Sequence, residues 1–333
     1  MNDRNESATT RETAADMAAV ASLLEMADRL GVLDVLQRES PFGAKEIAEA
    51  AEVPQAGAAS YLHALAAAGL VVRADDAGAF RAADDFADRL YESGYMSWVL
   101  NANRPFIEHI AEFLRDPVRA GAQYVRDGRQ VAVASQWMGS QAFYPKALST
   151  IIEARPSRVV DLGAGTARLL IETLLAVPGS TAVALDLDGS ACREAATAAK
   201  LAGVGDRLTV VERSIQSVAD DPSPLEGADV IHAGFVFHDM LPDEEDVADA
   251  VLSNCYDALR PGGIMAITDA VPFVPNERER RFSTIVTYYH QQFMRRRLLT
   301  AEEWQEKLVK AGFGGTTCIA HRFPTGRLFL AHK

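Results

Sequence analysis

The chain has 333 residues, of which 48% are hydrophobic, so it is long enough to form two domains with large buried cores. Its 46 acidic residues outnumber its 33 basic ones, and a net charge of -13 disfavours nucleic acid and anionic membrane surfaces as partners. Three cysteines without CxxC spacing argue against a disulfide framework or a thiolate metal site, and the lack of a long apolar run or signal core predicts a cytoplasmic protein.

The N-terminal third has the pattern of a winged helix. Residues 1–13 are polar and are predicted to form a disordered tail. The elements expected after it are helices at 14–36, 44–51 and 56–68, a strand at 70–73, a turn at 75–78 and a returning strand at 79–81. Two short helices followed by a small hairpin are typical of a winged helix, so we delimit such a domain at residues 14–100.

The rest of the chain changes from helical to alternating character. Residues 101–152 are helical and rich in aromatic residues, and we interpret them as a connector that lines a substrate pocket. In residues 153–333 strand and helix patterns alternate, which is typical of a mostly parallel sheet covered on both faces in an α/β fold. We expect strands at 158–162, 181–185, 208–212, 230–233 and 264–269, and a late edge strand within 323–331.

A glycine loop follows the first of these strands, in the run Asp161-Leu162-Gly163-Ala164-Gly165. Glycines let the backbone approach a ligand where a side chain would collide, although many structural turns share this pattern. Asp186 ends the next strand about 20 residues later, where a carboxylate can accept hydrogen bonds from a ribose. The third glycine of the dinucleotide fingerprint is replaced by Arg168, which favours adenosylmethionine over NAD.

Together with the blocks 229–232 and 259–263, these residues resemble the class I S-adenosylmethionine (SAM)-dependent methyltransferases. More narrowly, the chain is similar to the small-molecule O-methyltransferases that carry an N-terminal winged-helix dimerisation domain. The resemblance implies a homodimer with a Rossmann-like methyltransferase domain and SAM as cofactor. The cofactor-binding residues that it implies are Asp161, Gly163 and Gly165 in the loop, Asp186 at the ribose, Ser214 and Ile215 beside the adenine, and Gly234 at the methionine end.

The winged helix has two interpretations, DNA binding and dimer formation. Residues 45–92 carry nine acidic and four basic side chains, whereas a DNA reader needs a basic face to hold phosphates. The charge therefore disfavours DNA binding, and with it the third hypothesis of a non-catalytic winged-helix regulator. The family resemblance implies that the winged helix forms the dimer.

His238 follows the fourth expected strand, and active sites of open α/β sheets lie at the carboxyl ends of strands. Packing in the core is the alternative role for such a histidine. In the O-methyltransferase family, the histidine of the matching His-Asp motif is the general base that takes a proton from the substrate hydroxyl. Metal ligation is the competing functional role, and it needs a second ligand.

His290 is the candidate second ligand, although it can also be a helix-surface residue. The His238 and His290 pair resembles the metal-dependent 2-oxo acid C-methyltransferases, of which phenylpyruvate C-methyltransferase is one. The resemblance implies a divalent ion on the two histidines, and Fe, Zn or Co fits such a donor set. A Lewis acid on the keto oxygen stabilises the enolate needed for C3 methylation. Asp239 either acts as base or orients a water, or it caps the helix that follows.

A 2-oxo acid substrate also needs a cation for its carboxylate. Arg126 and Arg129 are candidates because a guanidinium fork suits a carboxylate, although either can be a solvated surface residue. Trp98 and Trp137 are candidate pocket walls, with core packing as the alternative. The main hypothesis is C3 methylation of a 2-oxo acid such as 4-methyl-2-oxopentanoate or phenylpyruvate. The alternative is O-methylation of a secondary metabolite with His238 as general base.

Overall fold

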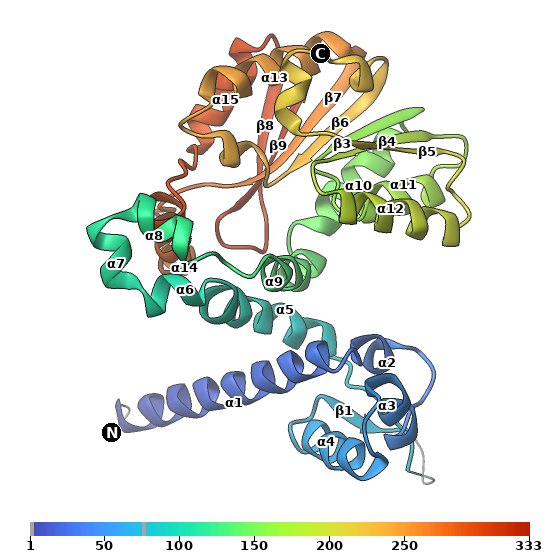
Figure 1. Cartoon of the computed structure of the whole chain (residues 1–333), viewed down its shortest axis with the longest axis vertical. Coiled ribbons are helices and arrows are strands. Elements are labelled where there is room, and N and C mark those ends of the chain that lie inside the picture. The colour runs from blue at the N-terminus through green and yellow to red at the C-terminus, as the bar shows by residue number, and fades with distance from the viewer. Residues whose placement is uncertain (1–2, 75–77) are drawn as a thin grey trace. The chain divides into compact units, whose positions relative to one another are not determined.

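The computed structural model describes residues 3–74 and 78–333, with side chains from residue 13 onward. The chain divides into two compact units (Figure 1). Unit 1 comprises Met1–Ile110 and Tyr124–Gln141, and unit 2 comprises Ala111–Gln123 and Ala142–Lys333. The segment 101–152, expected from sequence to be one connector, is thus divided between the two units. Among the described residues, no helix combines the length and apolar character needed to cross a bilayer.

Unit 1 is mainly helical. Its elements are α1 (Asp3–Arg29), α2 (Leu33–Gln37), α3 (Ala44–Ala51), α4 (Gln55–Ala67), β1 (Val71–Arg73), β2 (Phe80–Ala82), α5 (Phe86–Met96), the π-helix η1 (Ser97–Ala102), α6 (Arg104–Glu108) and α9 (Gly128–Gln141). Helix α1 begins at Asp3, inside the stretch expected to be a disordered tail. This part of the helix was not predicted because its polar residues show no helical spacing of apolar side chains. Once a helix has formed, each further residue adds one backbone hydrogen bond, so the helix can extend into a polar segment. Residues 1–2 lie outside the described chain.

The winged-helix pattern is present in unit 1. Helices α3 and α4 precede the antiparallel pair β1 and β2, and Phe42 adds an isolated bridge to Phe80. Residues 75–77 of the predicted turn lie outside the described residues. Side chains from every part of this arrangement share one buried core, including Leu24, Phe42, Ile47, Leu62, Leu65, Leu70 and Trp137. The wing therefore folds as part of unit 1 and not as a separate module.

Unit 2 holds a seven-stranded sheet. Its strands are β3 (Arg158–Leu162), β4 (Thr181–Asp186), β5 (Leu208–Glu212), β6 (Ala228–Gly234), β7 (Leu259–Ala270), β8 (Gly314–Ala320) and β9 (Gly326–His332), in the order β5-β4-β3-β6-β7-β9-β8. Strands β3 to β7 pair in parallel, whereas β9 is antiparallel to both β7 and β8. The late strand expected at 323–331 is therefore not an edge strand, because β8 pairs outside it.

Helices cover both faces of the sheet (Figure 1). They are α10 (Tyr144–Ala154), α11 (Arg168–Ala176), α12 (Gly189–Leu201), α13 (Glu245–Ala258) and α15 (Ala301–Lys310). The chain also forms α7 (Ile110–Arg115), α8 (Pro117–Gln123) and α14 (Glu277–Tyr288), which are not on the sheet. The 3-10 helices η2 (Ile215–Ala219) and η3 (Ser223–Leu225) lie between β5 and β6, the 3-10 helix η4 (Phe237–Met240) follows β6, and the π-helix η5 (Tyr289–Phe293) follows α14. Each face of the sheet carries its own hydrophobic core, and successive residues of β3 point to opposite faces. Val159 packs among side chains of α10 to α12, and Val160 packs among those of α13 and α15.

This strand order brings the ends of β3, β4, β6 and β7 to one edge of the sheet. The order of the strands reverses at β3. Strands β4 and β5 lie on one side of β3, whereas β6 and β7 lie on its other side. Ligands of open α/β sheets bind outside the carboxyl ends of the strands at such a switch point. The candidate site is therefore built from the residues that follow β3, β4, β6 and β7.

Candidate active site

The glycine loop after β3 is held in a conformation that favours glycine. Gly163 has φ of 73° and Gly165 has φ of 53°, both in the left-handed region. A Cβ on Gly163 would lie 2.3 Å from Cγ1 of Val236, so the loop packs directly against the turn that follows β6. The amide N–H groups of Gly163 and Ala164 both donate to the Leu185 carbonyl, which fixes the loop to the end of β4.

Asp186 binds the loop from the end of β4. Its Oδ2 accepts a hydrogen bond of 2.7 Å from the Gly165 amide, and its Oδ1 accepts one of 2.9 Å from the Asp188 amide. Two carboxylate oxygens have about four acceptor positions, so capacity remains for ribose hydroxyls. Asp186 therefore has a loop-anchoring role in addition to the ribose contact expected from sequence.

The residues expected beside the adenine follow β5. The Ser214 hydroxyl accepts a hydrogen bond of 3.3 Å from the Ser217 amide and so caps η2, and Ile215 packs against the core on the α13 face. Gly234 ends β6 and pairs with Thr268 of β7. These positions follow the ends of neighbouring strands, as the sequence argument expects, and their contacts with a cofactor stay predictions.

Asp161 forms a buried pair that the sequence argument missed. It is the register partner of His232 on β6, and His232 Nδ1 lies 2.7 Å from Asp161 Oδ1. Both side chains are buried, at 4% and 7% exposure. Sequence alone could identify two polar residues within apolar strands, but their pairing depends on the register between β3 and β6.

His238 lies in η4, directly after β6, and is paired with a carboxylate from the neighbouring strand. Its Nδ1 is 2.6 Å from Oδ1 of Asp269, the buried residue near the end of β7. A carboxylate only accepts hydrogen bonds, so Nδ1 donates, and in the neutral ring Nε2 is the basic atom. Burial by itself lowers the pKa of His238, but the charge and hydrogen bond of Asp269, with the charge of Asp239, raise that pKa above its usual value.

Asp239 connects His238 to the basic run at 295–297. Its Oδ1 lies 3.3 Å from His238 Nε2 and 2.7 Å from Nη1 of Arg296. The alternative role as a cap of the next helix is wrong, because the cap position of α13 is Glu244. The guanidinium of Arg296 compensates the charge of Asp239, and the Arg296 amide donates to the His290 carbonyl. Arg296 therefore joins the two parts of the chain that carry the histidines.

His290 lies beside His238 and is not a surface residue. The two ring centroids are 5.0 Å apart and the rings are nearly perpendicular, at 89°. His290 is buried in the π-helix η5, and its Nδ1 donates a hydrogen bond of 2.7 Å to the Val286 carbonyl. In the neutral ring this bond keeps the proton on Nδ1 and leaves Nε2 unprotonated, which is the form that can ligate a metal or accept a proton.

The two histidines fit a metal only in part. Between residues 3–74 and 78–333, no group of three or more His, Cys, Asp or Glu side chains is arranged to hold a metal ion. A divalent ion at His238 and His290 would thus have two imidazole ligands and would need oxygen atoms from substrate or water. The donor types suit Fe, Zn or Co, while the protein alone supplies an incomplete coordination shell.

Aromatic rings form one wall beside His238. Phe235 makes edge contacts with Phe143 and Phe323, at centroid distances of 4.6 and 6.2 Å, and it lies 6.5 Å from the His238 ring. Phe235 has φ of 56°, an uncommon conformation for a bulky residue, which costs about 1–3 kcal/mol and often occurs at functional sites. None of these three residues was individually predicted from sequence to line the pocket.

The residues proposed to bind substrate from the earlier part of the chain belong to unit 1. Trp98 is buried in η1, and Trp137 belongs to the core of unit 1, which supports core packing for the latter. Arg129 makes a two-pronged ion pair with Asp28 at 2.8 and 3.0 Å, so its guanidinium is already occupied. Arg126 donates to Asn103 at 3.4 Å and stacks over Phe106, and it remains the better of the two candidates.

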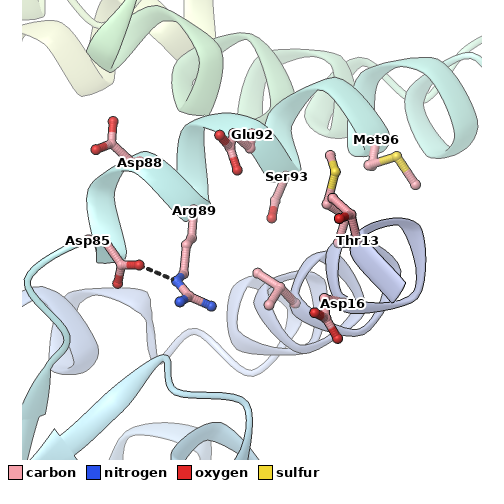
Figure 2. A pocket seen from close by; sticks show the side chains of 10 residues that line it. Thr13, Asp16, Asp85, Asp88, Arg89, Glu92, Ser93 and Met96 are labelled. Carbon is pink, nitrogen blue, oxygen red and sulfur yellow. Dashed lines mark hydrogen bonds and ion pairs between the residues drawn. The ribbon is translucent and has the colours of Figure 1, made fainter. Parts of the chain in front are cut away.

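A cavity of about 440 Å³ lies in unit 1 between α1 and α5 (Figure 2). Its walls carry four acidic side chains and one basic one, namely Asp16, Asp85, Asp88, Glu92 and Arg89. Arg89 pairs with Asp85 at 2.7 Å. An acidic wall of this kind repels carboxylates, so this cavity is not a site for a 2-oxo acid.

Comparisons with known proteins agree with this geometry. Residues 160–265 match a family model described as a methyltransferase domain. The chain is 30% identical over 154 residues to aclacinomycin 10-hydroxylase RdmB of Streptomyces purpurascens, a match that covers 46% of this chain and 39% of that protein. It is also 26% identical over 169 residues to the methyltransferase ungE' of Aspergillus campestris, a match that covers 49% of each chain. The chain thus spans less than half the length of both curated relatives.

Solved structures with the same fold span nearly the whole chain. Human N-acetylserotonin methyltransferase in complex with SAM has a TM-score of 0.60 and 18% identity, covering 100% of this chain and 99% of that chain. The mitomycin 7-O-methyltransferase MmcR has a TM-score of 0.56 and 18% identity, covering 99% of both. The chain therefore has the Rossmann-like fold of the class I SAM-dependent methyltransferases, and its residues 160–265 match a methyltransferase domain.

Proposed function

We propose that the protein is a SAM-dependent methyltransferase that methylates a hydroxyl oxygen of a small secondary metabolite, with His238 as general base. The observation that carries this proposal is the hydrogen bond between His238 and Asp269 at the carboxyl ends of β6 and β7. It leaves Nε2 of the neutral ring to take a proton, and the turn that holds His238 also packs Val236 against Gly163. The matched methyltransferase domain supports methyl transfer, and the structural neighbour MmcR is named an O-methyltransferase, whereas the curated relative RdmB is named a hydroxylase.

The residues around the glycine loop fit SAM. Gly165 leaves open space where a side chain would stand, Asp186 has acceptor capacity for the ribose, and Asp161 is a carboxylate beside the loop. When bound, SAM supplies an electrophilic methyl group on a sulfonium. His238 then removes the hydroxyl proton as oxygen attacks, and Asp269 stabilises the imidazolium that forms. The aromatic wall at Phe235 favours substrates with a planar apolar ring next to the hydroxyl.

A direct test uses SAM labelled with ¹³C in the methyl group, the full chain, and panels of phenols and 2-oxo acids. NMR separates O-methyl from C-methyl carbons, and mass spectrometry measures S-adenosylhomocysteine (SAH). We expect an O-methyl product from the wild type and a loss of roughly 10²–10⁴-fold in turnover for His238→Ala. A wild type that binds no SAM, or a His238→Ala variant with full turnover, would refute the proposal.

A second candidate is metal-dependent methylation of C3 in a 2-oxo acid. The proximity of His238 and His290, with ring centroids 5.0 Å apart, is the specific observation in its favour. A divalent ion there would polarise the keto oxygen of the substrate. The role of the chain is to present Nε2 of both imidazoles, each set by a hydrogen bond at Nδ1 to Asp269 or Val286.

We also propose that the protein is a homodimer formed through unit 1. The family resemblance implies this interface, and Met26 of α1, which is 50% exposed, is available for contact with a second copy. Sedimentation analysis of Met26→Asp tests the assignment. We expect this variant to shift the protein toward monomer, whereas Leu201→Asp on the exposed end of α12 serves as a control and should not. A monomeric wild type would overturn the proposal.

A further inference from the structure

The buried pair of Asp161 and His232 lies beneath the proposed cofactor loop. The two residues face each other across β3 and β6 as register partners, and His232 Nδ1 is 2.7 Å from Asp161 Oδ1. An unpaired carboxylate is strongly disfavoured in such an interior position. His232 is the side chain that makes a charged Asp161 tolerable at 4% exposure.

The hydrogen bond with His232 uses only one of the two carboxylate oxygens of Asp161. Nδ1–H of His232 donates to Oδ1, because a carboxylate only accepts. Among the described residues, no hydrogen bond is found at Oδ2 of Asp161 or at Nε2 of the buried His232 ring. Asp161 begins the run that contains Gly163 and Gly165. Oδ2 is therefore the acceptor that this pair leaves for a ligand of the loop.

The same imidazole supports Gly234. A Cβ built on Gly234 would lie 3.3 Å from Cε1 and 3.9 Å from Nε2 of His232, so the ring fills the space beside this backbone position. Gly234 ends β6 next to the turn that carries Phe235 and His238. His232 thus binds Asp161 and lies beside Gly234, and the methionine end of the cofactor is expected at these two residues.

We infer that His232 is a positioning residue for the amino acid end of the cofactor, acting through Asp161. It holds Asp161 so that Oδ2 accepts a hydrogen bond from the α-ammonium group of SAM or SAH, and it keeps the Gly234 backbone in place. The inference rests on the proposed function, since it concerns the same cofactor site. It predicts that His232 discriminates between ligands that have an α-ammonium group and ligands that lack one.

A purely structural pair behaves differently. If His232 only stabilises the sheet, its replacement lowers the melting temperature and weakens all ligands of the loop to a similar extent. If it positions Asp161, the loss is confined to ligands with the α-ammonium group. 5′-Methylthioadenosine lacks the amino acid end but keeps the adenosine and the sulfur, so it is the reference ligand for the full-length protein.

Calorimetry with SAH and 5′-methylthioadenosine tests this on three variants. His232→Phe keeps the ring volume but removes the donor, and we expect roughly 10- to 100-fold weaker SAH binding with 5′-methylthioadenosine almost unchanged. His232→Asn keeps an N–H donor near the position of Nδ1 and should bind both ligands like the wild type. Thr268→Val is the matched control, because it removes another buried polar atom without a hydrogen-bond partner among the described residues, on the neighbouring strand β7.

The outcomes are distinguishable. Equal weakening of both ligands in His232→Phe, or the same selective loss in Thr268→Val, overturns the positioning role. If His232→Phe does not fold, His232→Gln replaces it, since its amide reaches the Nε2 position and not that of Nδ1, and the same selective loss is expected. Failure of the wild type to bind either ligand refutes the proposed function and not the role of His232 alone.

Discussion

Gly163 and Val236 are in direct contact, so that a Cβ on Gly163 would lie 2.3 Å from Cγ1 of Val236. This contact joins the proposed cofactor loop to the segment that carries His238. No side chain larger than hydrogen therefore fits at position 163 while Val236 keeps its place. The proposed cofactor loop and the segment of the proposed base are thus packed directly against each other.

The first prediction concerns this contact. Gly163→Ala should destabilise the protein by about 1–3 kcal/mol through overpacking, in addition to the strain of its left-handed backbone. Gly165→Ala shares the left-handed backbone but meets no atom within 4 Å, so it should lower the melting temperature less. Thermal unfolding of both variants and of Gly163→Ala/Val236→Ala measures this. Equal destabilisation by the two glycine variants would contradict the role of the Val236 contact.

The second prediction concerns pH. His238 must lose its proton to act as a base, and its pKa lies above the usual value, so kcat/KM should rise with pH through that raised pKa. Asp269→Asn removes the charge that raises the pKa while burial, which lowers it, remains. The acid limb should therefore move to lower pH, with a lower maximal rate. Burial lowers the pKa of His321 to about 4, so that residue cannot produce the limb, and His321→Gln is the control.

The third prediction separates the two candidate reactions. Under O-methylation, His290→Ala should keep substantial turnover and chelators should have no effect. Under metal-dependent C-methylation, His238→Ala and His290→Ala should each abolish turnover, chelators should inactivate the wild type, and Fe, Zn or Co should restore it. A 2-oxo acid in deuterated water would then exchange its C3 protons without SAM. Full activity on a 2-oxo acid after complete chelation would contradict the metal mechanism.

The fourth prediction concerns Asp186. Asp186→Ala removes the acceptor for the Gly165 amide as well as the proposed ribose contact, so SAM affinity should fall by about 1.5–3 kcal/mol. The adenosine end is affected, and 5′-methylthioadenosine should therefore weaken together with SAM. Calorimetry with both ligands measures this, and the opposite pattern is expected for His232→Phe. An unchanged affinity for 5′-methylthioadenosine would mean that Asp186 does not hold the ribose.

Much of the sheet could be predicted from sequence because its strands are short apolar runs with turn residues between them. The expected strands at 158–162 and 208–212 match β3 and β5 residue for residue. The order of β8 and β9 could not be predicted, since apolar pattern indicates a strand but not its neighbours. For the same reason Asp269 was missed as the partner of His238, although both the strand that ends with it and His238 itself were predicted from sequence.

The position of β9 has a consequence for synthesis on the ribosome. Strand β9 comes after all the other strands in chain order, yet it pairs with β7 on one side and β8 on the other. Until residues 326–332 have left the exit tunnel, β7 has an open edge with unpaired amide and carbonyl groups. Such an edge is a template for pairing with other nascent chains. Translation of the final strand is therefore the step that closes the sheet, and chains arrested before it should depend on chaperones to stay unaggregated.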